Sequence, residues 1–379
     1  MPRFAFAQLV LLELAAAAAL SGLAYGGVWT IVGPSVGAAV LLVAVVPLHR
    51  RWLYQAGASW VGLVRRRRRI AAGDEGGLEA LVGGYTVVTV PGARSGGDLG
   101  AVRVGTTWCL PLVLGLDDVV NDDAAVPVRL LAELMQVEDV PLSSVRLFTL
   151  TTPAQVVSGA PAGPDHALSP VAARYCLITL DTRRAAAAIA ARGGGEQAMN
   201  QILRRCAVQA EQTLSTAGLA VRRLREPAVR SLFAAWMGPA AAAGGRRRAR
   251  STESWGEVRV AGTRSVSFAV GGSGSDVPDR VARLAAAAPS AVVGSTLLLR
   301  RRPGRDRGPA ASGARRARLE DVEVAMILRF SVPDSEAAPD SGRAMMLLGR
   351  AYDLVMQRSG GEQGALLVAT TPLGVGEPA

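Results

Sequence analysis

The chain contains no lysine, and its 42 strongly basic residues are all arginine. A P-loop, a protein kinase and a pyridoxal enzyme each need a lysine side chain for binding or chemistry, so these three classes are excluded. Histidine is nearly absent too, because His49 borders an apolar stretch and His166 lies in a Pro- and Gly-rich one. Two histidines so placed do not favour a histidine-rich zinc site or a Ser-His-Asp triad.

Cysteine is also scarce, and the positions of the three cysteines indicate packing. Cys109, Cys176 and Cys206 each lie in an apolar strand or helix pattern, and none has CxxC spacing. We interpret them as reduced core residues in a reducing compartment, with a ligand or nucleophile as the alternative. The sequence therefore predicts no cofactor and no metal centre.

The positive charge is concentrated in three short segments. A formal net charge of +11 is typical of a protein that binds a polyanion. Nineteen of the arginines, however, lie within residues 50–69, 244–250 and 300–318. The rest of the chain carries more carboxylates than arginines, so the folded body does not present a basic surface. We therefore predict no nucleic-acid partner.

Residues 1–49 predict a hairpin of two transmembrane helices. The chain is almost wholly apolar from Phe4 to Tyr25 and again from Val28 to Leu48, with a tight turn between. The second stretch would be about 31 Å long as a helix, which matches a bilayer core. Arginines flank only the outer ends, so both termini and the main body are expected on the cytoplasmic side of the inner membrane. A cleaved signal peptide is the alternative.

Three residues inside these spans are candidates for intramembrane contacts. Glu13 lies near the middle of the first span, where a charged carboxylate costs roughly 2.5 to 3.5 kcal/mol unless it is protonated or meets a partner helix. The alternative is a helix that starts later, so that the carboxylate reaches the cytoplasmic interface. Gly33 and Gly37 form a GxxxG spacing, which permits close helix contact and is a weak signal alone.

Residues 50–70 predict an amphipathic helix at the membrane interface that ends in an arginine cluster. Trp52, Ala56, Trp60 and Leu63 or Val64 share one helical face, and five consecutive arginines follow them. Tryptophan at headgroup depth, with arginines worth about 1 kcal/mol each near anionic lipid, is typical of a membrane-surface contact. The alternative is a linker whose charges only repel one another. The candidate membrane-surface residues are Trp52, Trp60, Arg65, Arg66, Arg67, Arg68 and Arg69.

The remaining chain predicts an α+β fold, a cytosolic α/β-sandwich body of two similar halves at residues 82–237 and 255–373. GAVRVGTTWCLPLVLG (100–115) and GEVRVAGTRSVSFAVGG (256–272) both read as a β-hairpin. A helix, two strands, a long helix and a strand follow each hairpin, which gives the βαββαβ order of a ferredoxin-like sandwich. The alternative is a chance resemblance of two α+β stretches. The last helix and strand of the second half are expected at 342–357 and 365–371.

The best candidate for catalysis is the acidic loop GLDDVVNDD, which contains Asp117, Asp118, Asp122 and Asp123. Clustered carboxylates after a strand can bind Mg²⁺ or Mn²⁺, as in nucleotide-sugar transferases. A solvated loop that leads into a helix uses the same residues for capping and solubility. The glycine-rich stretch 192–197 can likewise cradle a phosphate or simply form a turn.

Three parts of the sequence carry a resemblance to a known family. They are the N-terminal hairpin with arginines behind it, the stretch RYCLITLDTRRAAAAIAARGGG followed by a long helix and AGLAVRRL, and the ending GGEQGALLVATTPLG. In these parts the chain resembles EccE, the membrane component of actinobacterial type VII (ESX) secretion systems. The resemblance implies a non-catalytic structural subunit that contacts EccB-, EccC- and EccD-like membrane subunits. The alternative is a membrane-anchored metal-dependent or degenerate transferase that uses the acidic loop.

Overall fold

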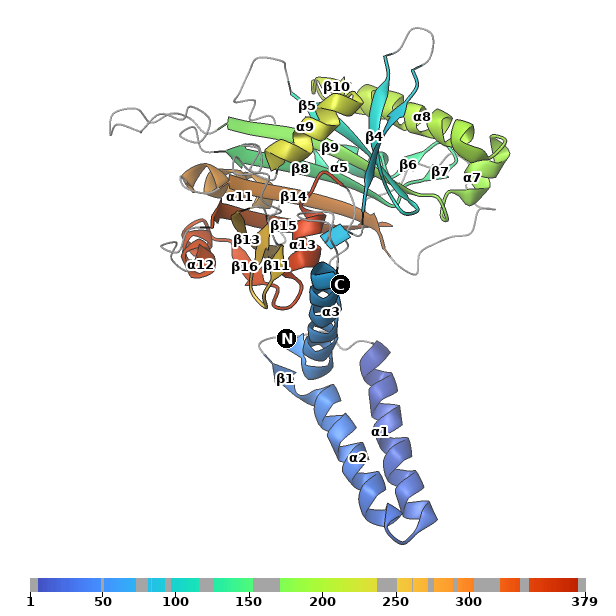
Figure 1. Ribbon diagram of the computed structural model, residues 1–379, viewed down its shortest axis with the longest axis vertical. Coiled ribbons are helices and arrows are strands. Elements are labelled where there is room, and N and C mark those ends of the chain that lie inside the picture. Colours follow the sequence, from blue (N-terminus) through green and yellow to red (C-terminus); the bar gives the residue numbers. More distant parts are fainter. Residues whose placement is uncertain are drawn as a thin grey trace. The chain divides into compact units, whose positions relative to one another are not determined.

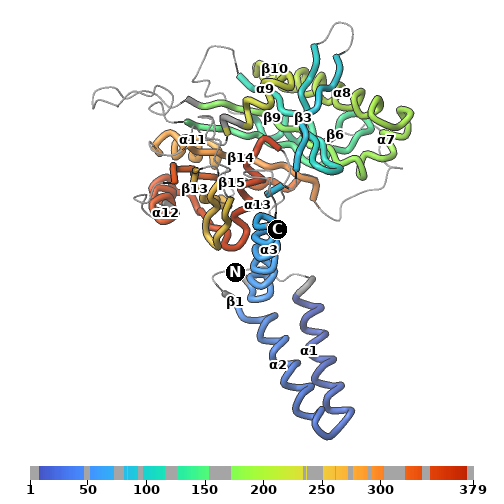
Figure 2. Tube along the Cα trace, viewed as in Figure 1, coloured from blue at the N-terminus to red at the C-terminus, as the bar shows by residue number. Residues whose placement is uncertain are grey.

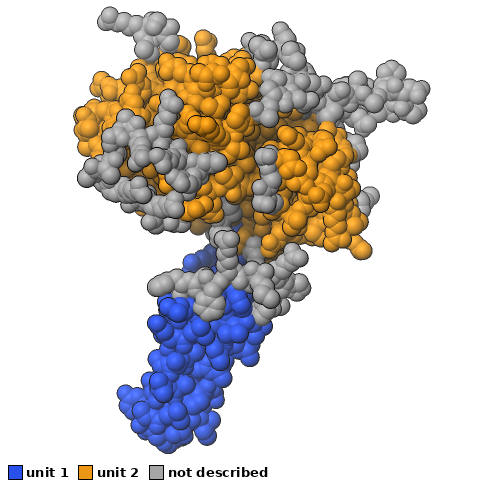
Figure 3. Space-filling model, turned by 180° about the vertical axis from the view of Figure 1, so that it is seen from behind, with its two compact units in different colours: residues 1–66 blue, residues 67–379 orange. Residues whose placement is uncertain are grey.

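The structure, a computed structural model, divides into two compact units (Figure 3). The first unit is residues 1–66 and the second is residues 67–379, and each is described by itself. The described residues are 6–48, 51–72, 81–82, 84–92, 97–115, 126–152, 171–236, 251–260, 262–271, 276–288, 292–302, 321–334 and 341–373.

The first unit begins with two apolar helices, α1 (Phe6–Tyr25) and α2 (Trp29–Val45), which lie side by side (Figure 1). Gly26 and Gly27 form the turn between them with φ of +69° and +59°, a conformation that favours glycine. Helix α1 is long and apolar enough to cross a membrane, and only 17% of its apolar window is buried, unlike the core helix of a soluble protein. Helix α2 is a shorter apolar helix of 17 residues.

The second span is shorter than expected because a proline ends it. Val46 has extended backbone angles, and the residue before a proline is disfavoured in helical geometry. Pro47–Leu48 then forms strand β1, which pairs with β2 (Arg51–Trp52). Helix α3 (Leu53–Ala72) follows directly, so the helix predicted over residues 50–70 is present.

The second unit is built on one sheet of twelve strands, and every pair of neighbouring strands is antiparallel. The order along the sheet is β11-β12-β13-β15-β14-β8-β9-β5-β4-β3, with β10 on β5 and β16 on β13. The predicted α+β class is therefore confirmed. The strands are β3 (Thr86–Val90), β4 (Leu99–Val104), β5 (Thr107–Leu114), β8 (Ser144–Thr152), β9 (Val171–Asp181), β10 (Val221–Arg223), β11 (Thr252–Glu253), β12 (Val258–Val260), β13 (Thr263–Gly271), β14 (Val292–Arg301), β15 (Val322–Pro333) and β16 (Val355–Arg358).

The strand order on the two sides of the sheet is the same. Strands β10-β5-β9-β8 run in the order fourth, first, third, second along the chain, and β16-β13-β15-β14 repeat this order. Strand β5 pairs with β4 through its first residues and with β10 through its last, and β13 divides its edge between β12 and β16 in the same way. The two sets meet where β8 pairs with β14, from Ser144 opposite Arg300 to Thr151 opposite Val293.

Helices cover both faces of this sheet, because alternate strand residues point to opposite sides. The first face packs in two apolar clusters against α5, α7, α8, α11 and α12. The second face packs against α9 and α13. The bounds of these helices are α5 (Val128–Glu133), α7 (Ala186–Ala191), α8 (Gly195–Ser215), α9 (Glu226–Trp236), α11 (Val277–Ala287), α12 (Ser341–Ala351) and α13 (Gln363–Ala369).

Two expected elements near the C-terminus are wrong. The helix predicted over 342–357 ends at Ala351, because Asp353 has a φ of +55° and residues 355–358 form strand β16. The strand predicted over 365–371 is the helix α13, whose apolar residues are buried all round. A short apolar run without alternation does not distinguish a buried strand from a buried helix.

Candidate functional site

The two apolar helices contact each other through glycines. A Cβ atom at Gly33 would lie 2.4 Å from Cα of Gly22, and one at Gly37 would lie 2.6 Å from the carbonyl oxygen of Ala15. Such distances are too short for any side chain, so the GxxxG spacing of α2 serves its contact with α1. The side-chain amide of Gln8 donates to the carbonyl of Ala44 at 2.8 Å across the same contact.

Glu13 lies outside this contact. Its side chain is exposed on α1, and no described residue forms a hydrogen bond or ion pair with it. The structure therefore separates the three predicted intramembrane residues into two glycines that pack the pair and one carboxylate that faces away.

The arginine cluster of α3 does not present one basic face. Successive residues of a helix are rotated by about 100°, so five consecutive arginines point all around the axis. Arg65, Arg67, Arg68 and Arg69 are exposed, and Nε of Arg67 also donates to the carbonyl oxygen of Glu253 at 2.6 Å. Trp60 is 57% exposed while Leu63 on the expected same face is buried. The predicted membrane-surface residues are thus in different environments, and Arg67 is bound to the second unit's own backbone.

Glu253 also binds the helix at the end of the chain. Its carboxylate is nearly fully buried and accepts from the amide of Gly364 at 2.8 Å, in the first turn of α13. A Cβ at Gly364 would lie 2.7 Å from the other carboxylate oxygen, so any other residue here would have to displace the carboxylate. Gln363, the neighbouring residue, accepts from the amide of Ser267 at 2.7 Å and donates to its carbonyl at 3.0 Å. The beginning of α13 is therefore fixed to β11 and β13.

The end of α13 is held from three other elements. Trp236 of α9 donates from its indole to the carbonyl of Thr370 at 2.7 Å, and Nη1 of Arg146 of β8 donates to the carbonyl of Ala369 at 3.1 Å. The thiol of Cys109 in β5 lies 3.7 Å from the carbonyl of Pro372. The last carbonyls of a helix lack partners within it, and here distant side chains supply them. Figure 2 shows α13 against the strands of the second half.

A second buried arginine, Arg329 of β15, lies in the same region. Its guanidinium carbon is 4.0 Å from the ring centroid of Trp236, a cation–π contact. Only 1% of Arg329 is exposed, and its Nε and Nη2 have no hydrogen-bond partner among the described residues. Desolvation lowers the pKa of Arg329 to about 9. A Cβ at Gly294 would lie 3.2 Å from its Nε, so a glycine leaves room for the side chain.

We call Arg146, Trp236, Glu253, Arg329 and Gln363 the α13 site. The anion Glu253 lies at the beginning of α13 and the cation Arg146 lies at its end, the arrangement that the helix dipole favours. Sequence analysis did not identify this site, because its residues are scattered over more than 200 positions and none stands in a motif.

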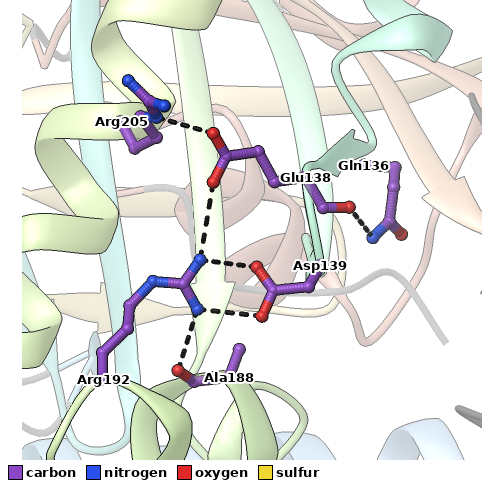
Figure 4. A network of polar contacts seen from close by, with 6 residues as sticks. All are labelled: Gln136, Glu138, Asp139, Ala188, Arg192 and Arg205. Atoms are coloured by element: carbon purple, nitrogen blue, oxygen red, sulfur yellow. Dashed lines mark hydrogen bonds and ion pairs between the residues drawn. The ribbon is translucent and has the colours of Figure 1, made fainter. Parts of the chain in front are cut away.

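A separate network of charges clamps a small hairpin of the first face (Figure 4). Strands β6 (Gln136–Val137) and β7 (Val140–Pro141) are joined by Glu138 and Asp139. Arg192 donates to both carboxylate oxygens of Asp139, at 2.9 and 2.5 Å, and to the carbonyl of Ala188 at 2.9 Å. The hydrogen bond from Arg192 lowers the pKa of Asp139. These groups are partly exposed to solvent, so the network is a modest structural clamp.

One continuous segment of the sequence contains much of this architecture. Residues 172–270 match the EccE family. The model that matches is described as "Putative type VII ESX secretion system translocon, EccE", and the segment runs from β9 to β13. The resemblance predicted from the sequence is therefore confirmed over this segment. No curated protein sequence gives a significant match to the chain.

The EccE segment contains two residues of the α13 site and two of the three cysteines. Trp236 and Glu253 lie within it, as do Cys176 and Cys206. All three cysteines, Cys109 included, are buried and free, and burial raises each thiol pKa to about 12. Such thiols are protonated at neutral pH and are poor nucleophiles or metal ligands.

The predicted catalytic candidates are not brought together in the described part of the chain. Residues 116–125, which include the four aspartates of the acidic loop, lie outside the described residues, as do His49 and His166. Among the described residues, no group of three or more His, Cys, Asp or Glu side chains is placed to hold a metal ion.

The two buried arginines of the α13 site predict opposite effects of one substitution. Arg146→Met leaves the buried carbonyl of Ala369 without this donor and should lower the free energy of unfolding by about 1 to 3 kcal/mol.

Arg329→Met removes a buried charge and should raise the unfolding temperature of the detergent-solubilised protein. Because the folded-state pKa of Arg329 is lowered, its charge destabilises the fold fully below pH 9 and less above. The advantage of Arg329→Met should therefore shrink above pH 9, and a lower unfolding temperature at neutral pH contradicts the prediction.

Proposed function

We propose that this protein is a non-catalytic, membrane-anchored structural subunit of a type VII (ESX) secretion complex. The match of residues 172–270 to EccE carries the proposal. The α13 site supports a structural role, because four of its five side chains, all but that of Arg329, form hydrogen bonds to backbone groups of the chain itself. Its partners would be the EccB-, EccC- and EccD-like membrane subunits.

We further propose that α1 and α2 both cross the inner membrane, with both termini and the main body in the cytoplasm. The 17 residues of α2 are at the short end of lengths that span a bilayer core. The turn between the helices carries no charge, whereas arginines flank their outer ends, which supports this orientation.

The body is proposed to consist of two pseudo-repeated ferredoxin-like halves, residues 82–237 and 255–373. The shared order of β10-β5-β9-β8 and β16-β13-β15-β14 supports the duplication, since a ferredoxin-like sheet has this order of its four strands. An experimental structure in which these two sets of strands fail to superpose would contradict it.

An export assay tests the structural role against the enzymatic one. Deleting the gene should impair export of small helical-hairpin substrates, because the complex would lack a subunit. Replacing Asp117, Asp118, Asp122 and Asp123 together by Asn should leave export nearly intact. Loss of export in the Asn variant, while it remains folded and complexed, would contradict the structural role and favour a metal-dependent transferase.

Cysteine labelling tests the orientation of the helix pair. The three native cysteines are buried, so background labelling by a membrane-impermeant maleimide should be low. Val28→Cys, at an exposed position just after the turn, should be labelled from outside intact cells. Gln197→Cys, at an exposed position of α8, should be labelled only after lysis. If intact cells label the cysteine at position 197 and not the one at position 28, the proposed orientation is wrong.

Vesicle binding tests the proposed contact of α3 with anionic lipid. Replacing Arg65, Arg66, Arg68 and Arg69 by Gln, while Arg67 keeps its bond to Glu253, should weaken binding of a chain that begins at residue 50 by at least roughly tenfold. Binding of the unchanged chain should fall with added salt.

A matched control removes the same charge elsewhere. Arg129, Arg183, Arg283 and Arg350 are exposed on the second unit, and their replacement by Gln should weaken vesicle binding far less. Equal losses in the two variants would show that net charge alone, and not α3, determines the binding.

A further inference from the structure

Helix α1 has a second set of regularly spaced residues on the side away from α2. The side toward α2 carries Gln8, Ala15 and Gly22, which are buried and seven residues apart. At about 100° per residue, the opposite side carries a set in which spacings of three and four alternate, and every member is exposed. This alternation is the pattern of a helix–helix packing surface. We call this set the outer seam, and its members are Val10, Glu13, Ala17, Leu20 and Ala24.

The carboxylate of Glu13 lies deep within α1. Glu13 is seven residues after Phe6, the first residue of α1, which is about 10 Å along an axis about 30 Å long. A glutamate side chain is shorter than the lysine and arginine side chains that reach the interface from within a bilayer. A carboxylate at this depth faces hydrocarbon unless a hydrogen-bond donor meets it, and such residues in membrane spans pair with other groups.

The chain itself supplies no basic partner at this depth. Between Phe4 and Leu48 the sequence contains no arginine and no histidine. Gln8, the polar side chain of α1 that faces α2, donates to Ala44 instead. A second copy of the chain would place Glu13 against another helix without a basic residue. The missing donor therefore belongs to a different protein.

The seam is also shaped for a close neighbour. Ala17 and Ala24 alternate with larger residues, and small side chains let a second helix approach closely. The remaining members, Val10 and Leu20, are apolar, so Glu13 is the single polar member of the set.

We propose that the outer seam binds one transmembrane helix of a different subunit, and that this helix presents an arginine, lysine or histidine to Glu13. The inference rests on the proposed function, because it takes α1 to lie in the membrane of the secretion complex. Glu13 then fixes the depth and rotation of α1 against its partner, while Gly33 and Gly37 hold α2 behind it.

Site-specific photo-crosslinking in native membranes tests the seam with the full chain. A benzophenone amino acid at Leu20 lies on the seam, and one at Leu14 is a matched control, since both leucines are exposed on α1 but face different directions. We expect position 20 to crosslink to a transmembrane segment of another protein that contains a basic residue, and position 14 to crosslink to that segment much less. A crosslink of position 20 to a second copy, or to lipid alone, overturns the proposal.

Substitutions at Glu13 test the charge. Glu13→Leu should reduce the amount of the crosslinked subunit that co-purifies by roughly tenfold, as expected for loss of an interhelical polar contact. Glu13→Arg should do the same, and replacing the partner's basic residue by Glu should restore co-purification. Unchanged co-purification of Glu13→Leu, or no recovery in the double variant, overturns the proposed pairing.

The outcome is distinguishable from failure of the proposed function. If the whole chain co-purifies with no secretion subunit and its deletion leaves export intact, the proposed function fails. If co-purification and export depend on the chain but not on Glu13 or the seam, only the inference about the seam fails.

Discussion

The antiparallel pairing of β8 with β14 is the contact on which the second unit depends. It joins two sets of strands of the same order into one sheet, and without it each set would expose an unpaired edge of long apolar strands. The pairing also makes each face continuous, so the helices of the first face and those of the second cover residues from both sets. Arg146 of β8 reaches α13, which lies mainly against strands of the other set. The junction between the two sets of strands is thus held both by the β8–β14 pairing and by the contact of Arg146 with α13.

The sequence predicted those parts of the fold whose signal is local. Strand alternation identified the hairpins at 100–115 and 256–272, and apolar length identified α1. The nature of α13 was not predictable in this way, because ALLVA is as apolar as a buried strand and its helical form depends on Glu253 and Gln363. The contacts of Arg67 and Arg329 were equally unpredictable. Arg67 is one of five consecutive arginines and Arg329 lies within a strand, and nothing in the neighbouring sequence indicates which distant group either side chain contacts.

Arginine has two opposed uses in this chain. On α3 the guanidinium groups are mostly exposed, and Arg67 donates to the carbonyl oxygen of Glu253. On the second face of the sheet, Arg146 and Arg329 are buried beside helix carbonyls and an indole ring. Arginine suits the buried positions, because its planar group stacks on aromatic rings and is less strongly hydrated than the ammonium group of lysine. The net charge therefore says little about what the protein binds, and the placement of each guanidinium says much more.

The position of α13 at the end of the described chain has a consequence for how the protein is made. The partners of α13 and of the residues just after it come from β5, β8, α9, β11 and β13, so these contacts are among the most distant in sequence. All of those elements are synthesised before α13, and until α13 is made the second face of the sheet is covered by α9 but lacks the carbonyl that Arg146 binds. Distant contacts form slowly, and incomplete sheets expose apolar surface. This face of the sheet is therefore completed only after α13 has been synthesised, and a chain cut short by a dozen residues before residue 373 would be left with polar groups and strand residues open to water.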